Sequence, residues 1–390
     1  MSLADYDERT AWKYLEIPDR FPTSPGLDRK VDPKSGKLKP FPGTTVVFRP
    51  EKFCSNVVRI MREALQSMLR GTGILASPLP LSTIHMTLHD MVSQDTCPFS
   101  PEDIRFSHTV TESLRDAWEI TEEVRRDFRG QSIAFTADRI VPMVSTSLVL
   151  LLRPVNDEDE ALIREIHHRF DRVQPLPYPL TPHITLAYFR PGMVNGEKLR
   201  NVLEAAQIPP EHPMEFEFHP EAITGQVFRD MGTYMDIPER ICFCCDGGLN
   251  RSVMAAGILN HLARERNLPV TGEARAACHG TEGRPIPEKV RRILARHGMA
   301  IPGDEPCARY LESTERTHFT CFAELSEGAA VRIGHLSLSG ERVVDRRCFQ
   351  GIRDPEYGEA THEQVFQELR KRTEKYLRDF EERYRNGILF

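Results

Sequence analysis

The sequence predicts a bilobal α+β domain followed by an α/β domain with a small parallel sheet. Three observations support this expectation: a strand-helix-strand unit that occurs twice in the front half, a strand-loop-helix unit that begins near residue 240, and a length of 390 residues. That length exceeds what one compact core usually holds and suits two domains. We place the domains at residues 1–237 and 238–390, joined by a short linker with one proline.

Composition and charge narrow the range of functions. Hydrophobic residues make up 40% and charged residues 28% of the chain, the balance of a globular protein. The net charge of −6 argues against binding along a nucleic-acid backbone, because such binding needs clustered Lys and Arg. A pocket for a single nucleotide or an RNA end remains compatible with this charge.

No segment predicts a membrane span or an export signal. The chain has no run of about 18 apolar residues, and residues 1–20 are polar and acidic. Its 9 cysteines lack the paired spacing of a zinc site, so we expect reduced thiols in a cytoplasmic protein. We expect no metal and no cofactor, and the sequence does not indicate an oligomeric state.

The front half repeats the order strand, helix, strand. The strand segments are rich in β-branched and aromatic residues, and the helical segments carry apolar residues at helical spacing. These segments are residues 44–49, 55–70 and 83–89 in the first copy, and residues 147–153, 157–173 and 182–188 in the second. The two copies predict two similar lobes.

The closing strand of each copy carries His-x-Thr, as His85-Met86-Thr87 and His183-Ile184-Thr185. Because side chains alternate along a strand, the histidine and threonine share one face while the middle residue faces the core. Packed as pseudo-symmetric lobes, the copies bring two imidazoles and two hydroxyls into one cleft. One imidazole takes a proton from water, the other protonates the leaving oxygen, and the hydroxyls hold phosphate oxygens. We therefore predict His85, Thr87, His183 and Thr185 as the catalytic residues of a phosphodiesterase.

The other histidines of this region have simpler interpretations. His89 continues the predicted face of His85, but its counterpart in the second copy is Ala187, so we expect it at the rim. A metal site from His85 and His89 lacks a third ligand. His167 and His168 lie on the predicted helix and are expected to be solvated.

The region from about residue 38 to 237 resembles the two-histidine (2H) phosphoesterase superfamily, which includes cyclic nucleotide phosphodiesterases and RNA-end ligase-like proteins. The resemblance rests on the two His-x-Thr motifs and on residues 40–46, which look like the first strand of one uncharacterised branch. It implies a bilobal α+β fold and metal-free hydrolysis of a cyclic or 2′-linked phosphodiester. It also implies that Tyr188, which follows the second motif, helps to bind phosphate.

The back half opens with an apolar strand at 241–244, a tight loop at 245–252 and a helix expected at 253–267. This order directs the loop amides and the positive end of the helix dipole at one point. Two glycines permit the positive φ angles that such an anion-binding loop needs. The predicted phosphate-binding residues are Gly247, Gly248, Leu249, Asn250 and Ser252.

Cys245 opens this loop and is the predicted nucleophile, because the surrounding dipoles stabilise its thiolate. Arg251 closes the loop and can bind two phosphate oxygens, and Ser252 can donate a hydrogen bond to the thiolate. The leaving alkoxide needs an acid, for which Asp354 is the candidate, in a loop before a helix at about 361–386. Two further cysteines, Cys242 and Cys244, are expected to be small buried residues of the strand.

Residues 240–385 resemble the low-molecular-weight protein tyrosine phosphatases. The matching segments are 245–252, 272–284, 289–298, 307–309 and 354–358. The resemblance implies a small parallel sheet flanked by helices, with Cys245 as nucleophile, Arg251 as phosphate-binding residue and Asp354 as general acid.

Four positions depart from the pattern of that family. Gly248 replaces the usual Asn, Asn250 replaces the second loop cysteine, and Val253 replaces a proline at the helix start. Glu356 replaces an aromatic residue that lines the tyrosine pocket, so a carboxylate would face the substrate. Arsenate reductases share this fold and would use Cys307 and Cys321 as redox partners, whereas the Asp354-Pro355 loop favours a phosphatase.

The two chemistries suggest an order. Opening a cyclic phosphate yields a phosphomonoester, which a cysteine-dependent phosphatase consumes. We therefore predict a bifunctional hydrolase acting on a cyclic nucleotide, an ADP-ribose cyclic phosphate or an RNA end. Two alternatives remain: a protein tyrosine phosphatase with a phosphoprotein substrate and a nucleotide- or RNA-binding front domain, and a back domain that only senses phosphate.

Overall fold

The computed structural model describes residues 17–50, 52–206, 214–266, 268–302, 307–312, 315, 319–335, 342–343, 346–355 and 361–388. The chain divides into two compact units, Met1–Met235 with Gly387–Phe390, and Asp236–Asn386. Buried hydrophobic residues form separate clusters in the two units.

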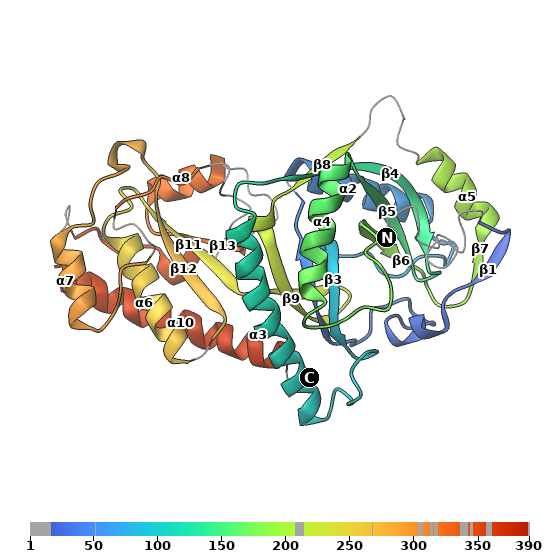
Figure 1. Cartoon of the computed structure of the whole chain (residues 1–390), viewed down its shortest axis with the longest axis horizontal. Helices are drawn as coiled ribbons and strands as arrows, with labels where there is room; N and C mark the ends of the chain where they lie inside the picture. The colour runs from blue at the N-terminus through green and yellow to red at the C-terminus, as the bar shows by residue number, and fades with distance from the viewer. Residues whose placement is uncertain are drawn as a thin grey trace. The chain divides into compact units, whose positions relative to one another are not determined.

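The front unit is built on an eight-stranded sheet, with the strand order β10-β9-β2-β3-β6-β5-β4-β8. Figure 1 labels β3, β4, β5, β6, β8 and β9 of this sheet. Neighbouring strands from β9 to β8 pair antiparallel. The strands are β2 (Gly43–Phe48), β3 (Met86–Ser93), β4 (Ile133–Met143), β5 (Ser147–Pro154), β6 (His183–Tyr188), β8 (Glu215–Phe218), β9 (Ile223–Asp230) and β10 (Thr233–Ile237). A small second sheet joins β1 (Arg20–Pro22) to β7 (Met193–Asn195).

The helices of the front unit are α2 (Lys52–Met68), α3 (Ile104–Asp127), α4 (Asp157–Phe170) and α5 (Gly196–Ala205). Along α2, Val58 and Leu65 are buried at helical spacing, so one face of this helix belongs to the core. At the start of α4, the Asn156 side chain accepts a hydrogen bond from the amide of Asp159, which caps the helix. Both α3 and α4 contact β3, and α2 contacts β6.

Both predicted strand-helix-strand units are present, as β2-α2-β3 and β5-α4-β6. The closing strands β3 and β6 are neighbours in the sheet. From this boundary outward, the order is β3, β2, β9 on one side and β6, β5, β4 on the other. The sheet therefore consists of two halves that meet at the strands with the His-x-Thr motifs.

The first closing strand differs from its prediction at its start. Residues 81–83 form a short 3-10 helix and β3 begins at Met86, so His85 lies just before the strand and not within it. The hydroxyl of Thr83 donates to the carbonyl of Pro80, which stabilises the turn that precedes the strand.

Both closing strands carry a bulge one residue after the motif. Thr87 and His89 of β3 pair with the adjacent residues Val47 and Val46 of β2, so Leu88 is an extra residue. The same shift on β6 makes Leu186 the extra residue. Without a bulge, His89 would face the same side of the sheet as Thr87. Because Leu88 is an extra residue, Asp90 faces that side in its place.

The predicted rim position of His89 is therefore wrong. His89 is 1% exposed and packs against His167 and Phe170, with its Nε2 3.0 Å from Oδ1 of Asp171. The prediction of a solvated His167 is also wrong, because this side chain is 7% exposed and its burial lowers its pKa to about 4. His168 is exposed, as expected.

The back unit contains a parallel four-stranded sheet with the order β12-β11-β13-β14. Its strands are β11 (Glu239–Cys245), β12 (Val270–Ala276), β13 (Cys321–Glu324) and β14 (Arg342–Val343), and its helices are α6 (Arg251–Glu265), α7 (Glu288–Arg296), α8 (Glu327–His335), α9 (Arg346–Phe349) and α10 (His362–Ile388). Helix α6 packs on β11 and β12, and α8 packs on β11 and β13. The predicted α/β class with a small parallel sheet is confirmed for this unit.

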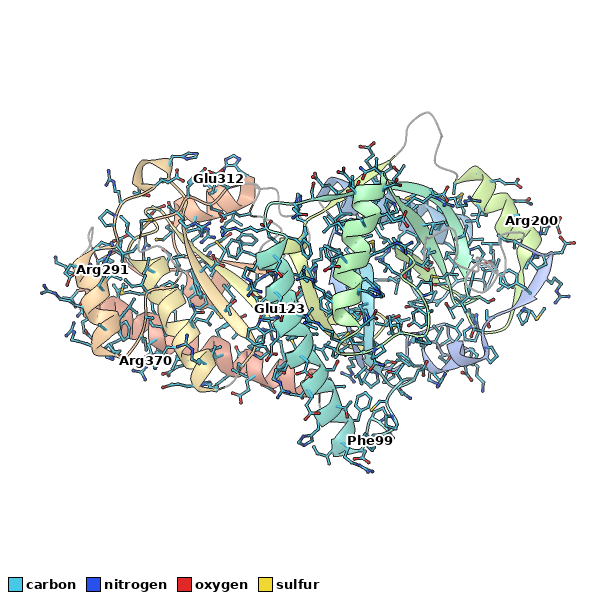
Figure 2. The ribbon with its side chains drawn as sticks, viewed as in Figure 1. Phe99, Glu123, Arg200, Arg291, Glu312 and Arg370 are labelled. Atoms are coloured by element: carbon cyan, nitrogen blue, oxygen red, sulfur yellow. The ribbon has the colours of Figure 1, made fainter. Side chains whose placement is uncertain are left out.

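Charged side chains occupy the outer faces of the helices, among them Glu123 on α3, Arg200 on α5 and Arg370 on α10 (Figure 2). Many of them pair locally, as Arg370 does with Glu374 one turn later. Among the helices in the described ranges, none combines the length and the apolar composition that crossing a bilayer requires.

Candidate functional site

The two His-x-Thr motifs meet at one residue pair. Met86 of β3 and Ile184 of β6 are antiparallel partners, and each is the middle residue of its motif. In such a register Thr87 lies across from His183, and His85 lies across from Thr185. Met86 and Ile184 are fully buried, whereas the four histidines and threonines are half-buried.

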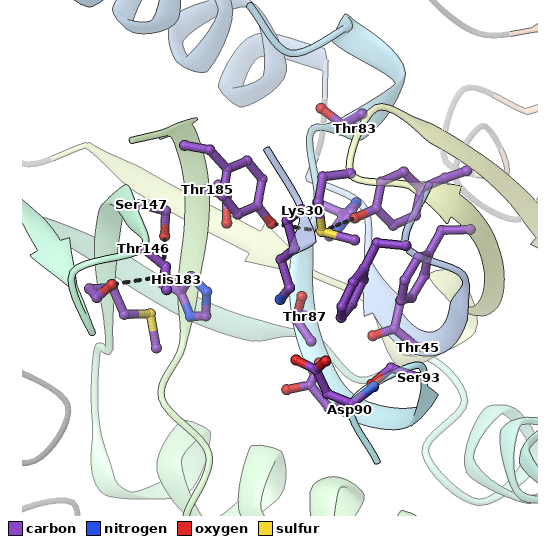
Figure 3. Close-up of a pocket in the computed structure, with 18 of the residues that line it drawn as sticks. Lys30, Thr45, Thr83, Thr87, Asp90, Ser93, Thr146, Ser147, His183 and Thr185 are labelled. Atoms are coloured by element: carbon purple, nitrogen blue, oxygen red, sulfur yellow. Dashed lines mark hydrogen bonds between the residues drawn. The ribbon is translucent and has the colours of Figure 1, made fainter. Parts of the chain in front are cut away.

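All four predicted residues, His85, Thr87, His183 and Thr185, line a single cavity of about 310 Å³ in the front unit. Figure 3 labels Thr87, His183 and Thr185 in this cavity. Asp90 and Tyr188 also line it. Each of them lies two residues after the bulge of its strand. The two halves of the sheet thus present equivalent positions to the same space.

His183 has a defined proton arrangement. Its Nδ1 lies 2.7 Å from the carbonyl oxygen of Thr181, and because a carbonyl oxygen only accepts, Nδ1 carries the proton. Burial lowers the pKa of His183, against smaller opposing effects of the Thr181 carbonyl and of Asp90. Its Nε2 therefore offers a lone pair. The ring of His85 packs edge-on against Tyr234, with 5.1 Å between the ring centroids.

Further polar groups extend into the cavity. The Lys30 ammonium lies 4.5 Å from the centre of the Phe41 ring, and Figure 3 shows Lys30 reaching into the space lined by the motifs. Burial lowers the pKa of Lys30, with Asp90 acting in the opposite direction. The predicted phosphate-binding residue Tyr188 lines the cavity, and its hydroxyl donates to the sulfur of Met231 at 3.1 Å.

Sequence reasoning missed Arg62, which connects the two motif segments from α2. Its guanidinium donates to the Thr185 carbonyl at 2.6 Å and to the Thr83 hydroxyl at 3.0 Å. The side chain is buried, and desolvation lowers its pKa to about 10. No local sequence signal separates Arg62 from Arg59 of the same helix, which is more exposed and pairs with Glu63.

In the back unit, the predicted loop follows β11 and α6 begins at Arg251, two residues earlier than expected. Gly248 has a φ of +62°, and a Cβ there would approach the backbone nitrogen of Ala276 to 2.8 Å. Both glycines were expected to permit positive φ angles, but only Gly248 adopts one, and Gly247 does not. Only Gly248 is required by backbone geometry at this turn.

The predicted nucleophile Cys245 is the last residue of β11 and is 2% exposed. Its sulfur lies 3.1 Å from the hydroxyl of Ser252, which is fully buried in the first turn of α6. A hydroxyl donor at this distance stabilises a thiolate. Cys242 and Cys244 are buried on the same strand, and burial raises the pKa of both thiols, so their predicted structural role is confirmed.

Arg251 and Asp354 form an ion pair, with 2.9 Å between a guanidinium nitrogen and Oδ2. The same guanidinium donates to the carbonyls of Leu325 and Ile352 at 2.7 and 3.1 Å. The structure therefore brings the predicted phosphate-binding residue and the predicted general acid together. Glu356, the predicted carboxylate at the substrate pocket, lies outside the described residues.

Asp246, which follows the nucleophile, was not predicted to have a role. Its carboxylate accepts a hydrogen bond from Ser326 at 2.9 Å and lies 3.5 Å from Arg251. The Ser326 hydroxyl also accepts from the amide of Ala329, in the first turn of α8. Asp246 thereby links the loop to α8, a connection between distant segments that no local sequence pattern shows.

The proposed redox pairing of Cys245 with Cys321 is contradicted by the register of the sheet. Cys321 pairs with Ile241, and Cys245 lies four residues further along β11. Four strand residues span about 13 Å, whereas a disulfide needs Cα atoms within about 7 Å. Cys307 lies in a separate bridge with Pro285.

Comparisons with known proteins support the interpretation of the back unit. Residues 240–386 match the family model described as low molecular weight phosphotyrosine protein phosphatase. No curated protein matches the chain.

Solved structures similar to the chain cover different shares of it. YfkJ from Bacillus subtilis is 20% identical over 37% of this chain and 96% of its own, with a TM-score of 0.33. The low molecular weight protein tyrosine phosphatase SP-PTP from Streptococcus pyogenes is 20% identical over 36% of this chain and 92% of its own, with a TM-score of 0.30. A conserved protein of unknown function, ATU0111 from Agrobacterium tumefaciens, is 14% identical over 55% of this chain and 98% of its own, with a TM-score of 0.36.

The family match, the parallel sheet and the strand-loop-helix arrangement of the nucleophile agree with one another. The second half of the chain is therefore a low-molecular-weight phosphotyrosine phosphatase-like domain, which supports a hydrolase of the cysteine-dependent phosphatase type.

Proposed function

We propose that this chain is a bifunctional phosphoester hydrolase. Its front domain is a 2H-type phosphodiesterase that opens a cyclic phosphate on a nucleotide, an ADP-ribose derivative or an RNA end. Its back domain removes the resulting phosphate. The observation that carries the first activity is the pairing of Met86 with Ile184, together with the cavity that both His-x-Thr motifs line.

In the front cavity, His183 acts as the general base. Its Nδ1 donates to the Thr181 carbonyl, so the lone pair of Nε2 is available for the proton of an attacking water. The water oxygen forms a bond to phosphorus and the ring P–O bond breaks. His85 gives its proton to the leaving oxygen, while the hydroxyls of Thr87 and Thr185 donate to the phosphate oxygens.

In the back domain, the Cys245 thiolate attacks the phosphorus of a monoester. An S–P bond forms as the P–O bond to the leaving group breaks, and Asp354 protonates the departing alkoxide. Water then hydrolyses the phosphocysteine and releases inorganic phosphate. In this proposal the incoming phosphate replaces Asp354 as the partner of Arg251, which frees the carboxyl group for proton transfer.

Two other functions predict different products. The match to a phosphotyrosine phosphatase family favours a protein phosphatase whose front domain only binds a nucleotide or RNA. The engagement of Arg251 by Asp354 and by two carbonyls favours a back domain that senses phosphate without turnover.

One experiment separates these functions. The full-length protein is incubated with 2′,3′-cyclic nucleotides, ADP-ribose 1″,2″-cyclic phosphate and an RNA with a cyclic phosphate end, and both the ring-opened product and free phosphate are measured. Appearance of both from one substrate supports the proposal. Turnover of a phosphotyrosine peptide without any ring opening supports the protein phosphatase, and absence of a trapped phosphocysteine supports the sensor.

A further inference from the structure

A second cluster of polar side chains lies in the front unit and has no part in the proposed hydrolysis. It consists of His89 on β3, His167 on α4 and Asp171, the residue that follows α4. One ligand atom from each residue lies within 4.8 Å of the others. His89 is 1% exposed and His167 is 7% exposed, so both imidazoles are inside the domain.

The hydrogen bonds of His89 leave one ring nitrogen facing a carboxylate. Its Nδ1 lies 2.8 Å from the carbonyl oxygen of Asp90, which only accepts, so Nδ1 carries a proton. In a neutral ring, Nε2 then presents its lone pair to Oδ1 of Asp171 at a distance of 3.0 Å. The lone pairs of Nε2 and Oδ1 repel each other at this distance, and a cation bound to both atoms would stabilise them.

His167 also has a ring nitrogen that is available to a ligand. Its Nε2 is buried and has no hydrogen-bond partner among the described residues. Its ring lies against that of His89, with 4.7 Å between the centroids. A buried polar nitrogen without a partner destabilises the fold, and a metal–nitrogen bond would remove that cost.

We propose that His89, His167 and Asp171 bind a divalent transition-metal ion of the zinc class. Two imidazoles and one carboxylate suit Zn²⁺ and do not suit Mg²⁺ or Ca²⁺, which prefer all-oxygen ligand sets. In a tetrahedral zinc site, ligand atoms lie about 3.3 Å apart. At 3.0 Å, the His89–Asp171 pair is already close to this spacing, and water completes the coordination.

The surroundings of the cluster match those of known metal ligands. In a ligating histidine, the second ring N–H usually donates a hydrogen bond to a carbonyl or carboxylate oxygen. In the same way, Nδ1–H of His89 donates to the backbone carbonyl of Asp90. The other oxygen of Asp171 lies 2.7 Å from Nδ1 of the exposed His168, which orients the carboxylate. His167 also lines a second cavity of about 350 Å³, which provides an access path for the ion.

Two of the three proposed ligands come from one helix end. His167 and Asp171 are four residues apart at the end of a helix and therefore share a face. The third ligand becomes available only because the bulge at Leu88 turns His89 away from the motif face. A bound ion would join the end of α4 to β3, beside Asp90 and the hydrolytic cavity, and would stabilise this wall of the domain.

The test uses the full-length chain carrying Cys245→Ser, so that the reactive thiol does not bind metal. Zinc binding is measured by isothermal titration calorimetry, Co²⁺ binding by its visible absorption bands, and stability by thermal unfolding. The variants are Asp171→Asn and His167→Gln, which keep side-chain size. The matched control is His108→Gln, which removes an exposed histidine from α3. A further variant, His168→Gln, removes the exposed imidazole that orients Asp171.

We expect one Zn²⁺ per chain, a higher Tm with Zn²⁺, and no change in Tm with Mg²⁺. Asp171→Asn and His167→Gln should weaken zinc binding by more than about 100-fold, and His108→Gln should not weaken it. His168→Gln removes only the hydrogen bond that orients Asp171, so its loss should stay within about 10- to 100-fold. Equal zinc binding in Asp171→Asn and in the parent chain overturns the proposal. So does a loss in His168→Gln as large as in His167→Gln, which would place the ion on the exposed surface. A parent chain without zinc-dependent stabilisation also overturns it and leaves only the contact between Nε2 of His89 and Oδ1 of Asp171.

Discussion

Met86 and Ile184 pair across the boundary between β3 and β6, and each is the middle residue of a His-x-Thr motif. This single pair places the two histidines and two threonines around one cavity. The arrangement assigns one imidazole and one hydroxyl to each half of the sheet, and the first prediction follows from it.

His85→Ala and His183→Ala should each reduce hydrolysis of a 2′,3′-cyclic nucleotide by about 100-fold or more, the usual effect of losing a general acid or base. The measurement is kcat/KM by release of the ring-opened product, with His108→Ala as a control for loss of an exposed imidazole. EDTA should leave this turnover in place, because both proton transfers are assigned to imidazoles. A chelator that abolishes activity while the fold persists would contradict the mechanism.

The pH dependence should report His183. A general base acts in its neutral form, and burial lowers the pKa of His183, so the base remains neutral to lower pH than a solvated histidine. The acidic limb of kcat/KM for the cyclic substrate should therefore have its midpoint below the ordinary value of about 6.5. A midpoint above that value would show that His183 is not the base. The pH profile of the residual kcat/KM of His183→Ala should lack this acidic limb.

The two loop glycines should respond differently to substitution. Gly248→Ala places a Cβ 2.8 Å from a backbone nitrogen at a φ of +62°, so it should cost about 1–3 kcal/mol in strain and lower phosphatase kcat/KM about tenfold or more. Gly247→Ala is the matched control, since its Cβ would first meet Thr281 at an ordinary 3.6 Å. The measurement is turnover of p-nitrophenyl phosphate, and equal losses in the two variants would disprove the assigned loop geometry.

Cys245 should be the first thiol to react with iodoacetate at about pH 6, because loop amides, the start of α6 and the Ser252 hydroxyl stabilise its thiolate. Mass spectrometry after partial labelling identifies the modified residue, and inorganic phosphate should protect it. Labelling of Cys54 or Cys97 ahead of Cys245 would be inconsistent with the phosphate-binding loop. Because Asn250 replaces the second loop thiol, mild peroxide should inactivate the site without an intraloop disulfide.

The two activities should be separable by mutation and ordered on one substrate. Cys245→Ser should abolish phosphate release and leave ring opening intact, so that a phosphomonoester accumulates. His183→Ala should block phosphate release from the cyclic substrate but not from the pre-opened monoester. The products are followed by ³¹P NMR. Unchanged phosphate release from the cyclic substrate in Cys245→Ser would refute the succession.

The acid assigned to the back domain has its own test. Asp354→Asn should slow phosphatase turnover most for a ribose monoester, whose alkoxide leaves only with a proton. It should matter less for p-nitrophenyl phosphate, because that leaving group departs without much protonation. An equal effect of Asp354→Asn on both substrates would assign Asp354 to binding of Arg251 alone.

How much of the site could be predicted depended on whether its parts are local in the chain. The strand-loop-helix unit around Cys245 is continuous in the sequence, so the residues of this site and their order could be predicted directly. The paired His-x-Thr motifs were readable because duplication and alternation are both visible in sequence. Cys321, by contrast, was a plausible partner of Cys245 until the register of two parallel strands separated them.

The bulges explain most of what the sequence concealed in the front domain. A bulge is a shift between two strands, and nothing in the residue pattern shows that Leu88 and Leu186 are the extra residues. The shift exchanges His89 and Asp90 between the two faces of the sheet. Arg62 was missed because its partners, the Thr83 hydroxyl and the Thr185 carbonyl, come from segments far apart in the chain.

The contact between β3 and β6 has a mechanical consequence. Most neighbouring strands of the front sheet share several residue pairs, but β3 and β6 share one, between Met86 and Ile184. Few backbone hydrogen bonds resist a rotation of one half of the sheet against the other about that pair. Such a rotation changes the width of the cavity and the separation of His85 from His183 together. Under the proposed function, a phosphodiester bound by both halves would set the angle between them, and its departure as a monoester would release that constraint.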